Sequence, residues 1–249
     1  MIRIANYYVH KGEEACISKR NGSGVFVFSG CNLRCCYCNI YRSSQMGEGY
    51  PVDVQDLSKI FLEYQSQGCN NLNLVNIGND KSDIIRALLR AKQDGLRIPV
   101  VCNSSGYESL DILNDLKGLI DIYLVDFKYG DNLAGLKYSG VADYFDTATR
   151  ALYEMYQQVG ETVLDDNEVL IKGILVRHLI LPGHIENAKQ VIDALHHCGF
   201  SQKMFLSILG QYMPEYRACE FPELTRRVTD AEYEIVVEYA RNKGMRLVW

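Results

Sequence analysis

Six apolar, β-prone segments alternate with stretches whose apolar residues recur at helical spacing, and this alternation restricts the fold more than any other feature. Strands that read as continuous apolar runs are typical of a parallel sheet covered by helices. We therefore expect an α/β protein with an open (β/α)6 barrel whose core covers about residues 24–210. A flat, doubly wound sheet is the structural alternative. The predicted strands cover residues 25–28, 71–76, 98–102, 120–127, 171–181 and 204–209.

The predicted helices lie between these strands and after the last one. Asp53 and Thr229 are suited to cap the first and the last helix. Residues 1–23 are expected to form a short, irregular lead-in; His10, Glu13, Glu14 and Cys16 lie there and could reach the site, although a capping loop is the expected role. Because no linker or internal repeat divides the chain, we expect a single domain over residues 1–249 with a C-terminal helix. The helices are predicted over residues 53–68, 84–95, 108–117, 143–159, 186–197 and 229–243.

Composition excludes several classes of protein. Apolar residues make up 47% of the 249 residues, which allows a sizeable core, and the net charge of −5 leaves no basic face for nucleic acid. No apolar run reaches membrane-spanning length, and residues 1–6 lack the core of a signal peptide. Nine unevenly spaced cysteines argue against a disulfide framework and fit a reducing compartment. We expect a cytoplasmic protein with no nucleic-acid or membrane partner.

Three cysteines follow the first predicted strand with the spacing C-x3-C-x2-C, at Cys31, Cys35 and Cys38. Zinc usually takes four ligands from two paired knuckles, and the sequence has no second C-x2-C or H-x3-H. Three close thiolates without a fourth suit a 4Fe–4S cluster with one open iron. Unligated thiols and a zinc knuckle remain the alternatives. Cys36 breaks the spacing and is expected to pack beside the loop as a small apolar residue.

Unusual polar residues also follow the other predicted strands. In a barrel of β/α units the active site gathers at the carboxyl ends of the strands, so these residues should meet at one rim. The residues at the strand ends are Asn76 to Asp80, Asn103 to Gly106, Asp126 with Lys128, Arg177, and Gln211 with Tyr212.

Two of these strand ends carry charges that a barrel interior has to neutralise. Asp126 and Lys128 are two residues apart, so they point to one face, either as a structural ion pair or as direct ligand contacts. Arg177 lies inside an apolar run and needs an anion, for which a ligand carboxylate is the expected partner. His178 must then point to the opposite face, where we expect a hydrogen-bonded packing histidine.

Several segments resemble one family. Phe28-Ser-Gly-Cys-Asn-Leu-Arg-Cys35, Tyr123-Leu-Val-Asp-Phe-Lys-Tyr129 and Val176-Arg-His-Leu-Ile-Leu-Pro-Gly183 are similar to segments of the radical S-adenosylmethionine (SAM) superfamily. Within it, the chain resembles the pyruvate formate-lyase activating enzyme-like proteins, and the similarity covers nearly the whole chain. The resemblance implies an open, partial TIM-type barrel.

The resemblance also implies a radical SAM oxidoreductase with one 4Fe–4S cluster held by Cys31, Cys35 and Cys38. The open iron would chelate S-adenosyl-L-methionine, and an electron from a donor such as flavodoxin or ferredoxin would cleave it to methionine and a 5′-deoxyadenosyl radical. In activating enzymes this radical removes a hydrogen from a glycine of a partner glycyl-radical enzyme. The alternatives are a radical SAM enzyme acting on a small molecule or another protein modification, and a non-catalytic iron–sulfur redox protein.

By position, the resemblance assigns SAM contacts to eight residues and reveals two departures. The second-strand loop of the family reads Gly-Gly-Glu, whereas residues 76–79 read Asn-Ile-Gly-Asn, and Asn103 replaces an aspartate beside a monovalent cation. Both departures speak against pyruvate formate-lyase as the partner and leave the cleavage chemistry intact. The implied contacts are Tyr37 to adenine, Asn76, Gly78 and Asn79 to the amino group, Ser104, Asp126 and Lys128 near the ribose and carboxylate, and Arg177 to the cofactor.

Overall fold

The computed structural model describes residues 1–19, 21–79 and 81–249, with the side chain of Asn79 also outside the description. Its strands are β1 Ile2–His10, β2 Ser23–Phe28, β3 Tyr50–Val52, β4 Leu72–Val75, β5 Val100–Ser104, β6 Ile122–Asp126, β7 Val163–Leu164, β8 Leu170–Leu179, β9 Phe205–Leu209 and β10 Leu247–Val248.

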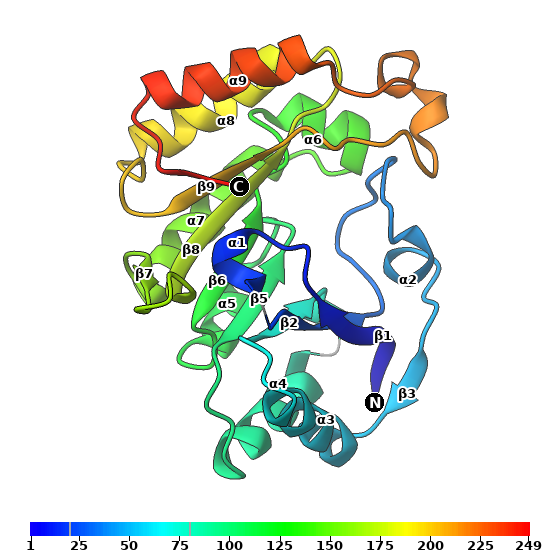
Figure 1. Cartoon of the computed structure of the whole chain (residues 1–249). Helices are drawn as coiled ribbons and strands as arrows, with labels where there is room; N and C mark the ends of the chain where they lie inside the picture. Colours follow the sequence, from blue (N-terminus) through cyan, green and yellow to red (C-terminus); the bar gives the residue numbers. More distant parts are fainter. Residues whose placement is uncertain (20, 80) are drawn as a thin grey trace.

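The strands form one open sheet that curves around a central space (Figure 1). Their order in the described part of the chain is β10-β9-β8-β6-β5-β4-β2-β1-β3, with β7 paired to β8 off this path. The six predicted strands correspond to β2, β4, β5, β6, β8 and β9, and each neighbouring pair among them is parallel. The expected open α/β barrel is therefore confirmed, and the flat doubly wound alternative is not needed.

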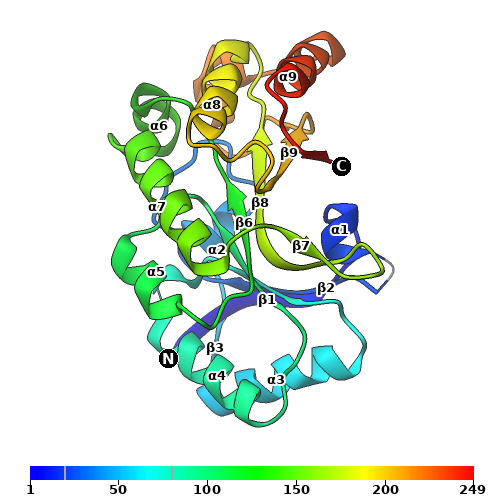
Figure 2. The same ribbon diagram turned by 90° about the vertical axis from the view of Figure 1, so that its left-hand side faces the viewer.

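The helices cover the outer side of this sheet, as Figure 2 shows for α5 and α7. Both predicted caps are present: the Asp53 side chain accepts from Asp56 N, and Thr229 forms a capping box with Glu232. No helix of the described ranges combines the length and the apolarity needed to cross a bilayer. The helices are α1 Ala15–Ser18, α2 Tyr41–Ser44, α3 Val54–Ser66, α4 Lys81–Gln93, α5 Leu110–Leu116, α6 Asn132–Ser139, α7 Tyr144–Val159, α8 Ile185–His197 and α9 Asp230–Asn242, with 3-10 turns η1 Ile77–Asn79, η2 Ala218–Glu220 and η3 Pro222–Leu224.

The N-terminal lead-in is not irregular, which corrects the sequence expectation for residues 1–23. Strand β1 pairs antiparallel with β2 and with β3, and the side chains of Ile2 and Ile4 are fully buried. Only the first few residues alternate apolar and polar, and the polar and aromatic residues that follow hide the strand pattern. The lead-in therefore adds the antiparallel strand β1 to the sheet, and β3, which comes later in the chain, pairs with its other edge.

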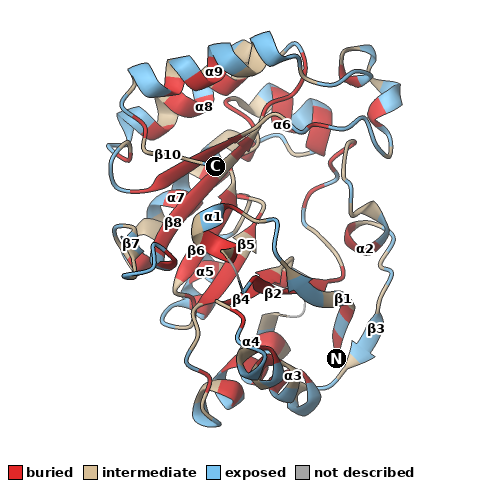
Figure 3. Ribbon diagram, viewed as in Figure 1, coloured by how far each residue is buried: buried red, intermediate tan, exposed pale blue. Residues whose placement is uncertain are grey.

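The short helix α1 lies on the concave side of the sheet, opposite the outer helices (Figures 1 and 2). Ile17 of α1 is fully buried there, and the strand residues around it point inward because side chains alternate between the two faces. Figure 3 shows β6 buried over most of its length and β8 buried in its middle part. Together these side chains form an apolar floor inside the barrel: Ile17, Val101, Ile122, Leu124, Leu170, Leu175 and Phe205.

Candidate active site

The cysteine loop follows β2 and is held from the side by the end of α6. Arg34 N donates to Ser139 O at 3.0 Å, and Cys36 N donates to Tyr138 O at 2.8 Å. A third backbone bond, from Arg217 N to Cys36 O at 2.8 Å, ties the loop to the chain after β9. Segments far apart in the sequence therefore fix the conformation of this loop.

Three thiols of this loop line one cavity of about 380 Å³. Cys31, Cys35 and Cys38 are all free rather than disulfide-bonded. Ser139 Oγ donates to Cys35 Sγ at 3.0 Å, and Ser44 Oγ lies 3.2 Å from Cys38 Sγ. Two of the three sulfurs thus have a hydroxyl partner, and Cys31 Sγ accepts from Leu33 N at 3.5 Å, as expected for metal ligands supported by an outer layer of hydrogen bonds.

The electrostatics of the thiols also fit a metal cluster. Burial raises the pKa of Cys31, and it raises the pKa of Cys35 to about 11, because a thiolate loses its hydration there. Metal coordination would supply the positive charge that stabilises the thiolates. Across residues 1–19, 21–79 and 81–249, no group of three or more His, Cys, Asp or Glu side chains is arranged to hold a metal ion. The three thiols line a common cavity, which leaves room for a group larger than a single ion.

Cys36 takes no part in this cavity wall. Its side chain is 4% exposed and packs in the main core, and burial raises the pKa of its thiol to about 12. The expectation that it packs beside the loop is confirmed.

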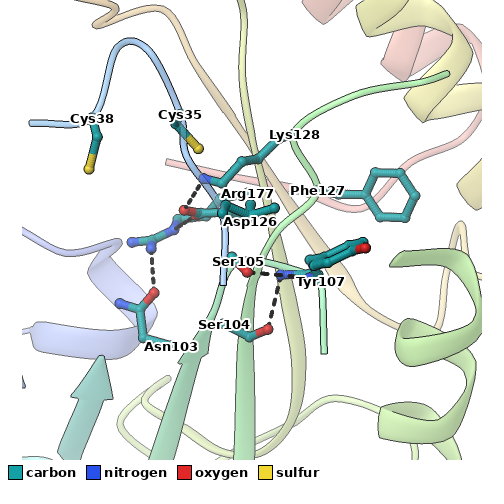
Figure 4. Close-up of polar contacts among 12 residues, drawn as sticks. Cys35, Cys38, Asn103, Ser104, Ser105, Tyr107, Asp126, Phe127, Lys128 and Arg177 are labelled. Carbon is teal, nitrogen blue, oxygen red and sulfur yellow. Dashed lines mark hydrogen bonds and ion pairs between the residues drawn. The ribbon is translucent and has the colours of Figure 1, made fainter. Parts of the chain in front are cut away.

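A layer of charged and amide side chains lies below the thiols, one step further along the strands than the apolar floor (Figure 4). Asp126 is in register with Arg177 on the neighbouring strand, and its Oδ1 lies 2.9 Å from Arg177 Nε. Its Oδ2 accepts from Lys128 Nζ at 3.0 Å. The guanidinium also donates to Asn103 Oδ1 at 2.9 Å and to Glu13 Oε2 at 3.0 Å. Arg177 is therefore held on three sides by the protein.

These contacts set the ionisation of the layer. Burial alone would raise the pKa of Asp126, but the charges of Lys128 and Arg177 outweigh it and hold that pKa at about 2. Burial raises the pKa of Glu13, and the attraction of Arg177 offsets this only in part. Asp126 and Lys128 point to one face, as predicted, and they form the ion pair that was one of the two expected alternatives.

Residues 25–215 match the family description of the Radical SAM superfamily. The chain belongs to this superfamily. Its members use a 4Fe–4S cluster and S-adenosylmethionine, so the cofactors expected from the resemblance are confirmed at the level of the superfamily.

Similar proteins and structures agree with this assignment. A Methanocaldococcus jannaschii protein described as uncharacterized is 29% identical over 251 residues, which cover 97% of this chain and 68% of that protein. The fold is similar to Streptococcus suis SuiB bound to precursor peptide SuiA, with a TM-score of 0.58, 12% identity and 88% of this chain covered. SuiB bound to S-adenosylmethionine gives a TM-score of 0.55 at 12% identity and 88% coverage of this chain. This radical SAM chain spans only 46% and 44% of those two chains.

Other predicted cofactor residues of this radical SAM protein lie on the same cavity wall. Tyr37 OH lies 2.7 Å from Tyr129 OH, and Ser104 Oγ donates to Glu108 Oε1 at 3.0 Å. Asn76 has a left-handed backbone, with φ of 63°, which asparagine tolerates better than most residues. These side chains accompany the thiols at the carboxyl ends of the strands.

One predicted residue, Gly78, is not brought to the wall: it lies in η1 and does not line the cavity. The side chain of Asn79 and the whole of Asp80 lie outside the described residues. His178 is buried on the opposite face of β8, where its Nδ1 lies 2.8 Å from Phe127 O, as expected for a packing histidine.

Two residues of the charged layer, Glu13 and Asn73, were not assigned to it from the sequence. Glu13 was expected in a capping loop, and no local signal could place it beside a residue 164 positions away. Asn73 Nδ2 donates to Glu13 Oε1 at 3.2 Å. A weak signal for Asn73 exists, because Asn71 and Asn73 alternate with Leu72 and Leu74 and so mark the polar, inward face of β4.

Proposed function

We propose that this radical SAM chain cleaves S-adenosylmethionine reductively and directs the radical to a glycine α-carbon of a protein substrate. One observation carries the proposal: the three thiols share a cavity with the Arg177 and Lys128 cations. The chain would act as one domain in a reducing compartment, with flavodoxin or ferredoxin as electron donor. When bound, the reduced cluster and SAM supply the 5′-deoxyadenosyl radical that abstracts the hydrogen.

The residues of the chain hold and orient these groups. Cys31, Cys35 and Cys38 would ligate three irons, leaving the fourth for the methionyl amino and carboxylate groups of SAM. Lys128 lies beside the cavity, and its ammonium group forms an ion pair with Asp126. The same ammonium group is suited to attract a carboxylate of the cofactor. By position, Tyr37 would contact the adenine, while Asn76 and Ser104 would hold the amino group and the ribose.

The barrel interior would protect the radical from water. The apolar floor closes the barrel below the charged layer, and the paired side chains of that layer leave few groups that require solvation. A dry cavity also strengthens the electrostatic contacts to a charged cofactor.

A peptide or protein substrate is supported by the fold and by the resemblance of the sequence. SuiB, whose fold is similar, binds a precursor peptide, and the activating enzymes that the sequence resembles act on a glycine of a partner enzyme. The test is to add candidate glycyl-radical enzymes to the reduced, SAM-loaded protein and record the electron paramagnetic resonance signal. A glycyl-radical doublet on the partner supports the proposal, and methionine formation without any radical on the partner contradicts it.

A second candidate, a different peptide modification, is favoured by Asn103. This neutral amide accepts a hydrogen bond from Arg177 at 2.9 Å, at the place where the activating enzymes carry an aspartate. A mass change or a crosslink in the substrate, with no stable radical, would select this alternative.

The cleavage itself has a sharp test with a matched control in the same loop. The protein is reconstituted anaerobically with iron and sulfide, reduced, and mixed with SAM. We expect 5′-deoxyadenosine and methionine from the wild type and from Cys36→Ala, and neither product from Cys38→Ala. Equal product from both variants would reject the assigned ligands, and product from neither the variants nor the wild type would favour a non-catalytic iron–sulfur protein.

A further inference from the structure

A second cavity of about 490 Å³ opens beside the candidate active site. It shares Arg177, Leu209 and Gln211 with the cavity of the thiols, so a group bound in one would adjoin a group bound in the other. Its remaining wall comes from the segment before α1, from β9, from the start of α9 and from Trp249. Figure 1 shows the C-terminus beside β9 and near α1, and Ala15 N donates to Trp249 O at 3.2 Å.

Glu14 gives this cavity an unbalanced negative charge. The residue is 7% exposed and part of the wall, yet its Oε2 is buried without a hydrogen-bond partner within the ranges that the structure describes. An unpaired buried carboxylate is costly, because its lost hydration is not replaced. Glu13 and Asp230 add two further carboxylates to the wall, whereas Arg177, the cation there, is already bonded to Glu13 and Asp126.

Two aromatic rings complete the chemistry of the wall. Tyr233 and Trp249 both line the cavity, and their ring centroids lie 6.4 Å apart. A cation is attracted by the faces of aromatic rings as well as by a carboxylate. A buried acceptor together with two rings is therefore suited to an ammonium or guanidinium group, and an anion would be repelled.

We infer that this second cavity binds a basic side chain, lysine or arginine, of the peptide or protein substrate, with Glu14 as its acceptor. The inference rests on the proposed function and deepens it by naming a substrate feature next to the reacting residue. The basic side chain supplies the donor that Glu14 Oε2 lacks, and the rings of Tyr233 and Trp249 contact its alkyl stem and charge.

The chain carries its own reporter for a test. Trp249 is the single tryptophan of the sequence, so its fluorescence reports on this wall. The probe is the capped tripeptide acetyl-Gly-Lys-Gly-amide, titrated into the full chain, and the matched probe carries norleucine in place of lysine. We expect saturable binding of the lysine probe, roughly tenfold or more weaker binding to Glu14→Gln, and no such loss for the norleucine probe.

Controls separate the site from general charge and from folding. Glu238→Gln removes the same charge from the exposed side of α9 and should bind the lysine probe as the wild type does. Because Glu14 Oε2 lacks a hydrogen-bond partner among the described residues, Glu14→Gln should melt no lower than the wild type. A lower melting temperature would show a structural pair and overturn the inference, as would equal affinity of Glu14→Gln and wild type for the lysine probe. If n-butylammonium binds as tightly as the lysine tripeptide, the cavity recognises a small amine, and the assignment to a peptide side chain is overturned.

Failure of this inference differs from failure of the proposed function. A wild-type protein that releases 5′-deoxyadenosine but binds both tripeptides equally overturns the basic subsite alone. A protein that binds the lysine probe through Glu14 but releases no 5′-deoxyadenosine retains the subsite and overturns the proposed function.

Discussion

Glu13 Oε2 lies 3.0 Å from Nη1 of Arg177, and this contact joins the N-terminal segment to the fifth parallel strand across the inside of the barrel. Both side chains are largely buried, at 12% and 15% exposed, so the pair is poorly screened by solvent. The lead-in is therefore a part of the barrel interior. It orients the guanidinium that also binds Asp126 and Asn103.

Removing the carboxylate of this pair should destabilise the fold. We expect Glu13→Gln to lower the free energy of unfolding by about 2 kcal/mol, because Arg177 loses one charged partner and keeps Asp126 and Asn103. Urea denaturation of the apoprotein measures this. Glu63→Gln, at an exposed position of α3, is the control and should change stability by less than about 0.5 kcal/mol. An equally small effect at Glu13 would contradict the structural role of the pair.

Removing the guanidinium of Arg177 should destabilise the fold more than removing the carboxylate of Glu13. Arg177→Gln leaves the buried Glu13 carboxylate without its cationic partner and with only the hydrogen bond from Asn73, and we expect a loss of about 3–5 kcal/mol in the free energy of unfolding. The double variant with Glu13→Gln should lose less than the sum of the two single losses, because the two residues contact each other. SAM affinity, measured by calorimetry on the reconstituted protein, should also fall for Arg177→Gln. Strict additivity in the denaturation series would show that the two side chains act independently.

The hydroxyl of Ser139 should raise the reduction potential of the cluster. It donates to Cys35 Sγ at 3.0 Å and lies 2.6 Å from Tyr129 OH, which in turn lies 2.7 Å from Tyr37 OH. Hydrogen bonds to a ligand sulfur stabilise the more negative, reduced cluster. We expect Ser139→Ala to lower the one-electron reduction potential by roughly 20–60 mV, which corresponds to one ordinary hydrogen bond.

Redox titration followed by electron paramagnetic resonance measures this potential. Ser43→Ala is the control, because the Ser43 hydroxyl donates to Ile40 O at 3.0 Å and not to a ligand sulfur. An unchanged potential in Ser139→Ala would rule out tuning through this bond.

His178 should make stability depend on pH. Burial lowers the pKa of His178 from 6.5 to about 4, with Lys128 adding to the effect and Phe127 O and Asp126 opposing it. Between about pH 6.5 and pH 4 the unfolded chain binds a proton that the folded chain does not, so stability falls as pH falls through this window. The loss on reaching pH 4 should be on the order of 3 kcal/mol relative to His178→Gln, which does not titrate. Parallel pH dependences for the two proteins, in urea denaturation of the apoproteins, would contradict this.

The sequence was sufficient where local patterns decide the structure. Each parallel strand was found because its residues are buried on both faces, and Asp126 and Lys128 were placed together because side chains alternate along a strand. Helix α6 was not predicted, because it has no clear apolar stripe. It is stabilised mainly by its caps at Asp131 and Gly140. Its C-terminal Ser139 reaches the cysteine loop, a contact of 104 positions that no local pattern encodes.

The missed side chains share one physical reason. Glu13, Asn73 and Ser139 act through partners from distant segments, so only the folded chain shows what they do. Arg177 was predicted to need an anion, which is correct, but the structure supplies two protein carboxylates. A buried charge in a sequence predicts a partner and does not tell whether that partner is a ligand or another residue.

The ties around the cysteine loop also order the events that mature this protein. The loop is synthesised early, yet Ser139 and Arg217, which hold it, come more than 100 and about 180 residues later. When the cysteine loop has just emerged from the ribosome, the segments that will enclose the iron and inorganic sulfide have therefore not yet been synthesised. We therefore expect the metal centre to be assembled after the segments up to Arg217 have been synthesised and have folded around the loop.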